Sequence, residues 1–258
     1  GLYPLAYMPH NRHFLWASAM FAGQGEMAIN AAEAMAAKID QEKMREPGLG
    51  TLQHFWVTPL YAWTRFGHWE TILATPEPAE DLIYPRAVRH YARAMALIRT
   101  ERPDEAATEI EALEALAADP ALEAITVWDI NTTAALMAIA VEVAQGELAA
   151  SRRRWGQAVE HLERGVALED GLNYDEPPPW YAPVRQILGA VLLEAGRVVE
   201  AEAVYLSDLE RFPDNGWSLF GLRQALTEQH RDAEAAEVAE KLASVFERAD
   251  VVLTSSRL

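Results

Sequence analysis

Two histidines near the start of the sequence, His10 and His13, have the residue type and spacing to bind a metal ion or a polar ligand. Residues three apart share one face of a helix, and Pro9 suits the first turn of such a helix. The partial positive charge at a helix start disfavours protonated imidazole. We therefore expect neutral rings, the form that ligates metal, although the sequence lacks the His-Glu-x-x-His motif of metalloproteases.

Motifs that define common enzyme classes are missing from the sequence. It has no Walker-type phosphate loop, no G-x-S-x-G nucleophile elbow, and no cysteine for a Cys-His pair, a disulfide or a thiolate metal site. The glycine-rich run at residues 22–26 is expected to be a turn between helices rather than a nucleotide loop. The sequence therefore favours a protein that is not an enzyme and leaves catalysis open at the histidines alone.

The charge balance argues against nucleic-acid binding. The formal net charge is −17 and the basic residues form a single run, Arg152–Arg154, whereas duplex binding needs clustered Lys and Arg. Negative charge favours cationic partners or simply serves solubility. The longest apolar stretch, residues 132–141, is too short to span a bilayer, and no signal peptide is visible. We therefore expect no membrane insertion and a cytoplasmic location, which the lack of cysteine fits.

A helical repeat is clearest in the second half of the chain. Leu188 and Gly189 are followed by Ala201, by Tyr205 four residues later and by Pro213 eight residues after that. Small residues at Gly189 and Ala201 let two helices approach closely, the tyrosine fills the space to the next pair, and the proline ends the second helix. The abundance of Ala, Glu, Leu and Arg also favours helices.

The same pattern recurs along the whole chain. The close-contact slot is alanine in five of six copies, and a turn precedes each slot. Because one hairpin cannot bury its own apolar face, successive hairpins must stack. Insertions at residues 45–50, 118–131 and 170–179 all follow a second helix, so we expect them on one edge of the stack. The slots are Ala28, Ile72, Ala106, Ala158, Ala201 and Ala235, and the turns begin at Gly23, Gly67, Glu101, Arg153, Gly196 and His230.

This spacing resembles the tetratricopeptide-repeat (TPR) family in a divergent form, since Arg185 and Leu192 stand where the family has Trp and Tyr. The resemblance covers residues 9–249 and implies an all-α, right-handed superhelical solenoid in one domain over residues 1–258, with the first helix of each pair lining a concave groove. The first helix of the fourth pair is expected to extend back toward Trp128, Asp129 and Asn131. The repeats are expected at residues 9–40, 51–76, 85–118, 122–170, 180–213 and 216–249.

The resemblance also implies which side chains face the groove. In the register of the family, His54 lies one hairpin away from His10 and His13 at the same height, so three of the seven histidines converge on one patch. The expected recognition surface combines these histidines with aromatic and cationic side chains. It consists of His10, His13, His54, Tyr61, Arg65, Tyr91, Arg99, Trp180 and Trp217.

A stiff segment at residues 174–181 reads Tyr-Asp-Glu-Pro-Pro-Pro-Trp-Tyr. Three consecutive prolines cannot be helical and favour an extended polyproline II rod. Such a rod either holds Trp180 and Tyr181 over the edge of the groove or serves as a spacer between repeats.

Two functions follow from these features. The leading prediction is a scaffold that binds a protein or peptide segment, or a small ligand, in the concave groove without a cofactor. The alternative is a metal-binding or metal-dependent protein with Zn, Cu or Fe on His10, His13 and His54, completed by a carboxylate such as Glu26 or Asp129. Ligand contacts without metal and a purely structural role are the other interpretations of the three histidines.

The first two expected repeats are the richest in aromatic residues, although terminal repeats need a polar outer face. We therefore expect either further repeats upstream, in a longer chain of which this sequence is a C-terminal part, or a partner chain that covers this end.

Overall fold

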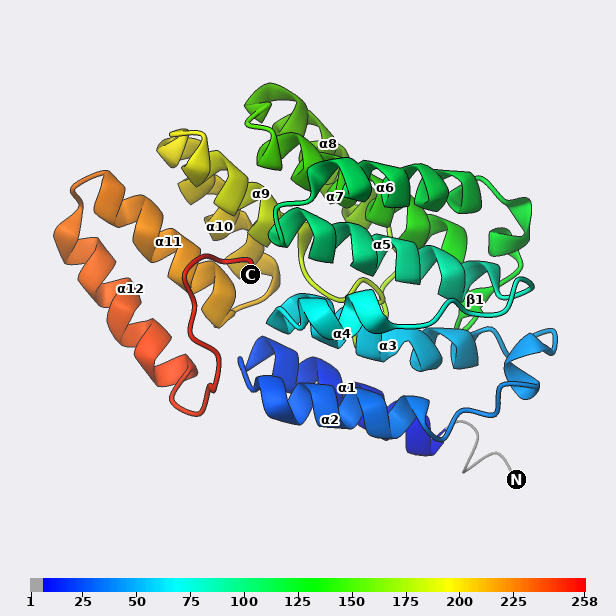
Figure 1. Cartoon of the computed structure of the whole chain (residues 1–258). Coiled ribbons are helices and arrows are strands. Elements are labelled where there is room, and N and C mark those ends of the chain that lie inside the picture. Colours follow the sequence, from blue (N-terminus) through cyan, green and yellow to red (C-terminus); the bar gives the residue numbers. More distant parts are fainter. Residues whose placement is uncertain (1–6) are drawn as a thin grey trace.

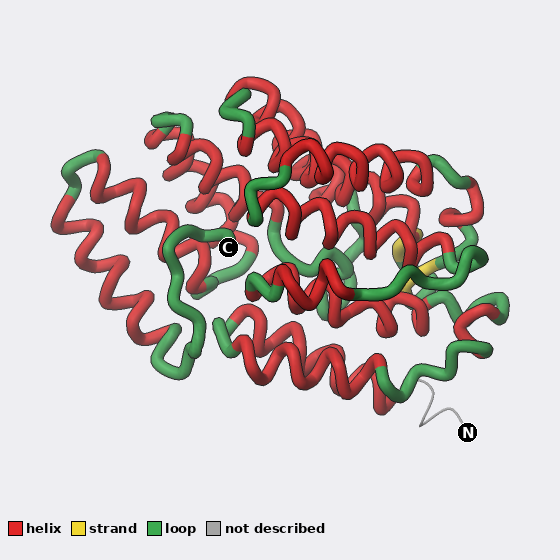
Figure 2. The backbone as a smooth tube through the Cα atoms, in the orientation of Figure 1, coloured by secondary structure: helices red, strands yellow, loops and turns green. Residues whose placement is uncertain are grey.

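The computed structural model describes residues 7–258, which fold into twelve α-helices, two short 3-10 helices and one two-stranded hairpin (Figure 1). Figure 2 shows how fully helix dominates the backbone. The expected all-α class is confirmed. The α-helices are α1 (Met8–Phe21), α2 (Gly25–Ala36), α3 (Thr51–Phe66), α4 (Trp69–Ala74), α5 (Ile83–Arg99), α6 (Pro103–Ala117), α7 (Thr133–Ser151), α8 (Trp155–Asp170), α9 (Val184–Glu194), α10 (Val198–Arg211), α11 (Gly216–Glu228) and α12 (Asp232–Val245).

Each helix packs against the next one along the chain, from α1 and α2 to α11 and α12. In Figure 1 the helices follow one another around the molecule in sequence order, so that α11–α12 come back beside α1–α2. Trp217 of α11 donates to the carbonyl of Met20 of α1 at 3.0 Å. One large cluster of buried apolar side chains draws on nearly all of these helices. A smaller cluster of Leu219, Phe220 and Leu242 joins α11 to α12.

Six turns between helices share one backbone geometry. Each contains a residue with left-handed φ, between 56° and 76°. The residue after it donates its backbone N–H to the carbonyl five positions earlier, at 2.8–3.0 Å, and this bond closes the preceding helix. Glycine adopts this conformation freely, and other residues adopt it at a cost of ~1–2 kcal/mol. The left-handed residues are those expected from the sequence: Gly23, Gly67, Glu101, Arg153, Gly196 and His230.

Small residues set the close approaches between helices, as expected. All six close-contact slots are buried, five of them completely. Tyr205 of α10 is fully buried between α9 and α11. A β-carbon added at Gly189 or Gly221 would lie only 2.4 Å or 2.1 Å from its ring. The tyrosine therefore fills the space between one helix pair and the next.

The insertions meet at one edge of the molecule. The second contains the 3-10 helix η3 (Pro120–Glu123) and the strands β1 (Thr126–Val127) and β2 (Asn131–Thr132). The Asn131 side chain donates to the carbonyl of Asn173 at 3.0 Å and accepts from its backbone N–H at 2.9 Å. Thr51, directly after the first insertion and its 3-10 helix η2 (Lys43–Arg45), accepts from the backbone N–H of Trp128 at 2.9 Å.

The expectation that the first helix of the fourth pair extends back to Trp128, Asp129 and Asn131 is wrong. Helix α7 begins at Thr133, where the side chain of Thr132 accepts from the backbone N–H of Ala135 at 3.2 Å. Residues 126–132 form an antiparallel hairpin instead. Trp128 and Asp129 have φ of 56° and 57°, and this left-handed backbone cannot continue a right-handed helix.

Within residues 7–258, α7 is the one helix long and apolar enough to cross a membrane by length and composition. The apolar stretch at residues 132–141 forms its first half and is thus part of a longer helix of 19 residues. About two thirds of the helix, 67%, is buried inside the protein, and a helix that is apolar all round is also typical of a protein core.

Candidate functional site

The structure brings the three predicted histidines together beside the edge that carries the insertions. His10 and His13 lie on α1, and His54 lies on α3. The rings of His13 and His54 are T-shaped with centroids 5.4 Å apart, and both side chains are 1% exposed. His10 is half-buried and its ring lies 5.4 Å from that of Trp128. The three histidines therefore lie near one another in the structure.

Several nitrogens of these rings lack a hydrogen-bond partner among the described residues. They are Nδ1 of His10, both nitrogens of His13 and Nε2 of His54. His54 uses its other nitrogen, Nδ1, in a hydrogen bond of 2.8 Å with the hydroxyl of Tyr84. Buried polar groups are normally paired, so this group of unpaired nitrogens is unusual for a protein interior.

Burial makes two of the histidines hard to protonate. It lowers the pKa of His13, with further lowering from nearby His54 and His10. It lowers the pKa of His54 to about 4. The expectation of neutral rings is confirmed for these two residues. The cause is loss of water around the charged form rather than the helix dipole assumed from the sequence.

Residues 7–258 contain no group of three or more His, Cys, Asp or Glu side chains arranged to hold a metal ion. Glu26 lies in the first turn of α2, beyond the turn at Gly23, and so at the other end of the hairpin from His10. Asp129 is exposed and accepts a hydrogen bond from Thr126 at 2.8 Å. Neither carboxylate is positioned with the histidines.

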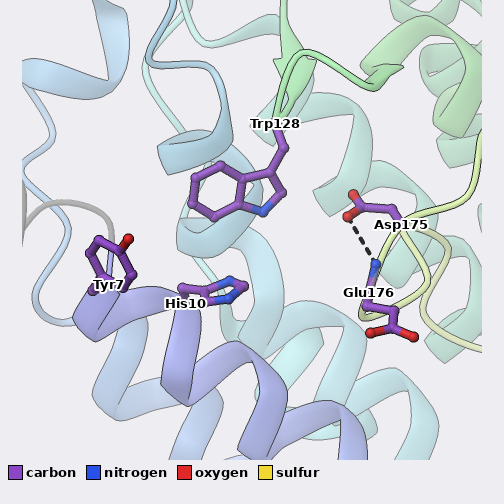
Figure 3. A pocket seen from close by; sticks show the side chains of 5 residues that line it. All are labelled: Tyr7, His10, Trp128, Asp175 and Glu176. Carbon is purple, nitrogen blue, oxygen red and sulfur yellow. Dashed lines mark hydrogen bonds between the residues drawn. The ribbon is translucent and has the colours of Figure 1, made fainter.

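Next to His10 lies a pocket of about 330 Å³, formed by Tyr7, His10, Trp128, Asp175 and Glu176 (Figure 3). Its walls come from the start of α1, the β1–β2 turn and the proline-rich loop. In Figure 3 the two acidic residues lie across the pocket from Tyr7, with the rings of His10 and Trp128 between them. Aromatic rings and carboxylates thus line opposite sides of one cavity.

The pocket residues are held in place by strained or hydrogen-bonded backbone. Trp128 projects from a turn in which two consecutive non-glycine residues have left-handed φ, a conformation that persists only when surrounding contacts impose it. The side chain of Asp175 accepts from the backbone N–H of Glu176 at 2.9 Å. Burial raises the pKa of Asp175, while this hydrogen bond and the nearby His10 lower it. The proline-rich loop itself therefore positions the two acidic residues of the pocket, Asp175 and Glu176.

Three of the predicted groove aromatics form a buried group of their own. The ring of Trp180 lies 6.0 Å from Tyr61 and 5.5 Å from Tyr91. Tyr181 stacks on Tyr61 at 4.7 Å, and its hydroxyl lies 2.9 Å from that of Tyr91. The proline-rich segment contains no helix, as expected. Its side chains Trp180 and Tyr181 are buried in the main core rather than laid over an edge, whereas Tyr174 is exposed.

The remaining predicted residues are paired inside the protein. The guanidinium of Arg65 lies 3.5 Å from the ring centroid of Trp217 and donates to the side chain of Gln186 at 2.5 Å. Burial lowers the pKa of Arg65 to about 10. Arg99 forms a two-pronged ion pair with Glu147 at 2.7 Å and 3.0 Å. These side chains fasten helices to one another.

Sequence reasoning missed the residues that shape the pocket, namely Tyr7, Trp128, Asp175 and Glu176. The available signal was the position of the last three within insertions, because insertions often carry the binding residues of repeat proteins. Tyr84, whose hydroxyl forms a hydrogen bond with His54, was also missed, because no feature of the nearby sequence indicates this contact.

Comparison with known proteins gives no match to any protein-family model and none to any curated protein. The resemblance to tetratricopeptide repeats therefore stays a prediction that depends on the repeat pattern.

Proposed function

We propose that this protein is a non-catalytic binding protein, built as a divergent TPR-like solenoid, whose edge pocket binds a small organic cation. The observation that carries the proposal is the pocket in which the rings of Tyr7, His10 and Trp128 lie opposite the carboxylates of Asp175 and Glu176. The solenoid itself is supported by the recurrence of one turn geometry at six positions.

A cation suits this pocket for two physical reasons. The face of an aromatic ring attracts a cation by ~0.5–2 kcal/mol, most strongly when the ring is tryptophan. The carboxylates of Asp175 and Glu176 supply the compensating charge. The net charge of −17 adds a long-range attraction for positive ligands. A cavity of about 330 Å³ lies within the range typical of small-molecule sites.

Calorimetric titration with benzyltrimethylammonium tests this proposal. We expect saturable binding to the intact chain and no binding of neopentylbenzene, its uncharged isostere. Replacing Trp128 by alanine should weaken binding about tenfold, which corresponds to ~1.4 kcal/mol of lost cation–π contact. The double variant Asp175→Asn/Glu176→Gln should weaken it at least as much.

Glu123→Gln is the matched control because Glu123 is exposed on η3, outside the pocket lining. It removes one negative charge and should leave the affinity unchanged. Equal binding of the cation and its uncharged isostere, or equal loss in the control, would show that the pocket does not select cations.

A metal site on His10, His13 and His54 is the second candidate. It is supported by the four ring nitrogens without partners and by the hydrogen bond that fixes His54 through Tyr84, since metal-ligating histidines usually engage their second nitrogen in this way. Elemental analysis of protein purified without an affinity tag decides between the two. Stoichiometric Zn, Cu or Fe that disappears in His10→Ala and His54→Ala would favour the metal site.

A further inference from the structure

The segment Asp250–Leu258, after α12, has no regular secondary structure and is nevertheless fixed at both of its ends. Figure 1 shows it running back from the end of α12 past α11 toward α9. At its start, the carboxylate of Asp250 accepts from the backbone N–H groups of Gly25 and Glu26 at 2.5 Å and 3.1 Å. The segment is therefore anchored first on the helix pair α1–α2 and then on the middle of the molecule.

Its second anchor is an arginine between two carboxylates. The guanidinium of Arg257 pairs with Glu147 of α7 and, at 2.7 Å, with Glu194 of α9. The side chain of Glu147 is completely buried and that of Arg257 is 9% exposed. Glu147 also holds Arg99. Burial of an ion pair is costly unless the geometry is good and the remaining lone pairs are used, and here both carboxylate oxygens are used.

The residues on either side of Arg257 are also held, one through its side chain and the other through its backbone carbonyl. The hydroxyl of Ser256, which is fully buried, donates to the carbonyl of Gln186 at 2.7 Å and lies 2.7 Å from the hydroxyl of Tyr205. The carbonyl of Leu258 accepts from Nε of Arg99 at 2.7 Å. Contacts to main-chain carbonyls combined with sockets for particular side chains are how proteins recognise extended peptides.

Between these two anchors the segment is weakly held. Val252 is 85% exposed, and the bond from Gln224 to the carbonyl of Thr254 is long, at 3.4 Å. Few buried apolar contacts and exposed backbone mark the part of a protein that opens at low free-energy cost. Opening of the segment is therefore expected to start at Val252–Thr254, next to the paired residues Ser256 and Arg257.

We propose that the surface formed by Arg99, Glu147, Gln186, Glu194 and Tyr205 is a binding site for an extended peptide that carries a small hydroxyl residue followed by arginine, and that residues 254–258 of this chain are its displaceable occupant. The chemistry of the site identifies the partner. The carboxylates of Glu147 and Glu194 would bind the guanidinium, and the carbonyl of Gln186 with the hydroxyl of Tyr205 would bind the serine or threonine. Arg99 would bind a backbone carbonyl of the peptide. This site lies on α5, α7, α9 and α10 and is independent of the edge pocket.

The test uses the full chain with Arg257→Glu, which sets a negative charge against Glu147 and Glu194 and releases the segment. The probe is a fluorescent synthetic peptide with the sequence of residues 251–258, followed by anisotropy. We expect this variant to bind the peptide at least tenfold more tightly than the unaltered chain, whose site is filled. The same peptide with its arginine replaced by alanine should bind at least tenfold more weakly.

Arg248→Glu is the matched control, since Arg248 is exposed just ahead of the segment. It makes the same charge change and should bind the peptide as weakly as the unaltered chain. A folded Arg257→Glu protein that binds the peptide no better than this control overturns the proposal.

A second measurement does not depend on the folding of that variant. The sequence has no cysteine, so Val252→Cys accepts a single nitroxide label. In the otherwise unaltered chain, millimolar peptide should raise the mobile fraction of the label, whereas the alanine peptide should not. A label whose mobility is the same with and without the peptide also overturns the proposal.

Discussion

Two regions of the molecule treat buried polar groups in opposite ways. Beside the insertion-bearing edge, His13 has no partner for either nitrogen and His54 has none for Nε2 among the described residues. Under the segment 254–258, by contrast, Glu147, Ser256 and Arg257 are all paired. An unpaired buried group costs ~1–3 kcal/mol. The comparison teaches that the first region leaves buried polar groups unpaired at a cost in stability, while the second uses its polar groups to hold the chain together.

The largest expected effect is in the region under the segment 254–258, where the polar groups are paired. Glu147→Gln leaves Arg99 and Arg257 buried without their shared carboxylate, and breaking a buried ion pair typically costs ~3–5 kcal/mol. We expect a loss of this size in the free energy of unfolding by urea.

Glu194→Gln is the control for that change, because the Glu194 side chain is 46% exposed and an exposed pair contributes ~0–1 kcal/mol. Similar losses in the two variants would contradict the idea that the buried carboxylate is the main fastening point.

The second effect is a pH dependence that belongs to the histidine region. The pKa of His54 is about 4 in the folded protein against 6.5 for the ordinary side chain. The unfolded chain therefore takes up the proton first as the pH falls, so the stabilisation is complete above about pH 6.5 and is lost toward pH 4. At ~1.4 kcal/mol per pKa unit, the shift corresponds to about 3 kcal/mol.

We expect the free energy of unfolding to fall between pH 6.5 and pH 4.5 in the intact chain, and to fall less in His54→Gln. Urea unfolding at a series of pH values measures this difference. The same slope in both proteins would mean that folding does not lower the pKa of His54.

The third prediction reverses the usual sign of a core substitution. His13→Leu removes two unpaired nitrogens from a side chain that is 1% exposed. We expect the free energy of unfolding to rise by ~1–3 kcal/mol. A thermal melt that shows a lower melting temperature than the intact chain would contradict the unpaired state of this ring.

The smallest expected effect comes from the opposite region. Ser256→Ala leaves the carbonyl of Gln186 and the hydroxyl of Tyr205 without the serine, and losing such a hydrogen bond costs ~1 kcal/mol. A decrease of this size, measured beside the increase for His13→Leu, would establish the contrast between the regions.

The parts of the structure that depend on local sequence could be predicted well. The turns at Glu101, Arg153 and His230 could be predicted although none of these residues is glycine, because each lies five residues before a close-contact slot, as the glycine turns do. The meeting of His10, His13 and His54 follows from the same register. A pattern that repeats needs no long-range information.

The rest depends on contacts between distant residues. The hairpin at Trp128 has no Asn-Gly or Asp-Gly turn signal, and the structure holds it through Thr51. Arg257 finds Glu147 across 110 residues of sequence, and no local feature marks that pairing. The acidic wall at Asp175 is set by the loop that buries Trp180 in the core.

Fluorine NMR of the chain labelled with 5-fluorotryptophan tests the central claim most directly, because the pocket and the buried interior each contain tryptophan. Titration with benzyltrimethylammonium should shift the resonance of Trp128 in a saturable way and leave that of Trp217, buried under Arg65, unchanged. A Trp128 resonance that does not move, or one that moves together with Trp217, would contradict a cation site at the edge pocket.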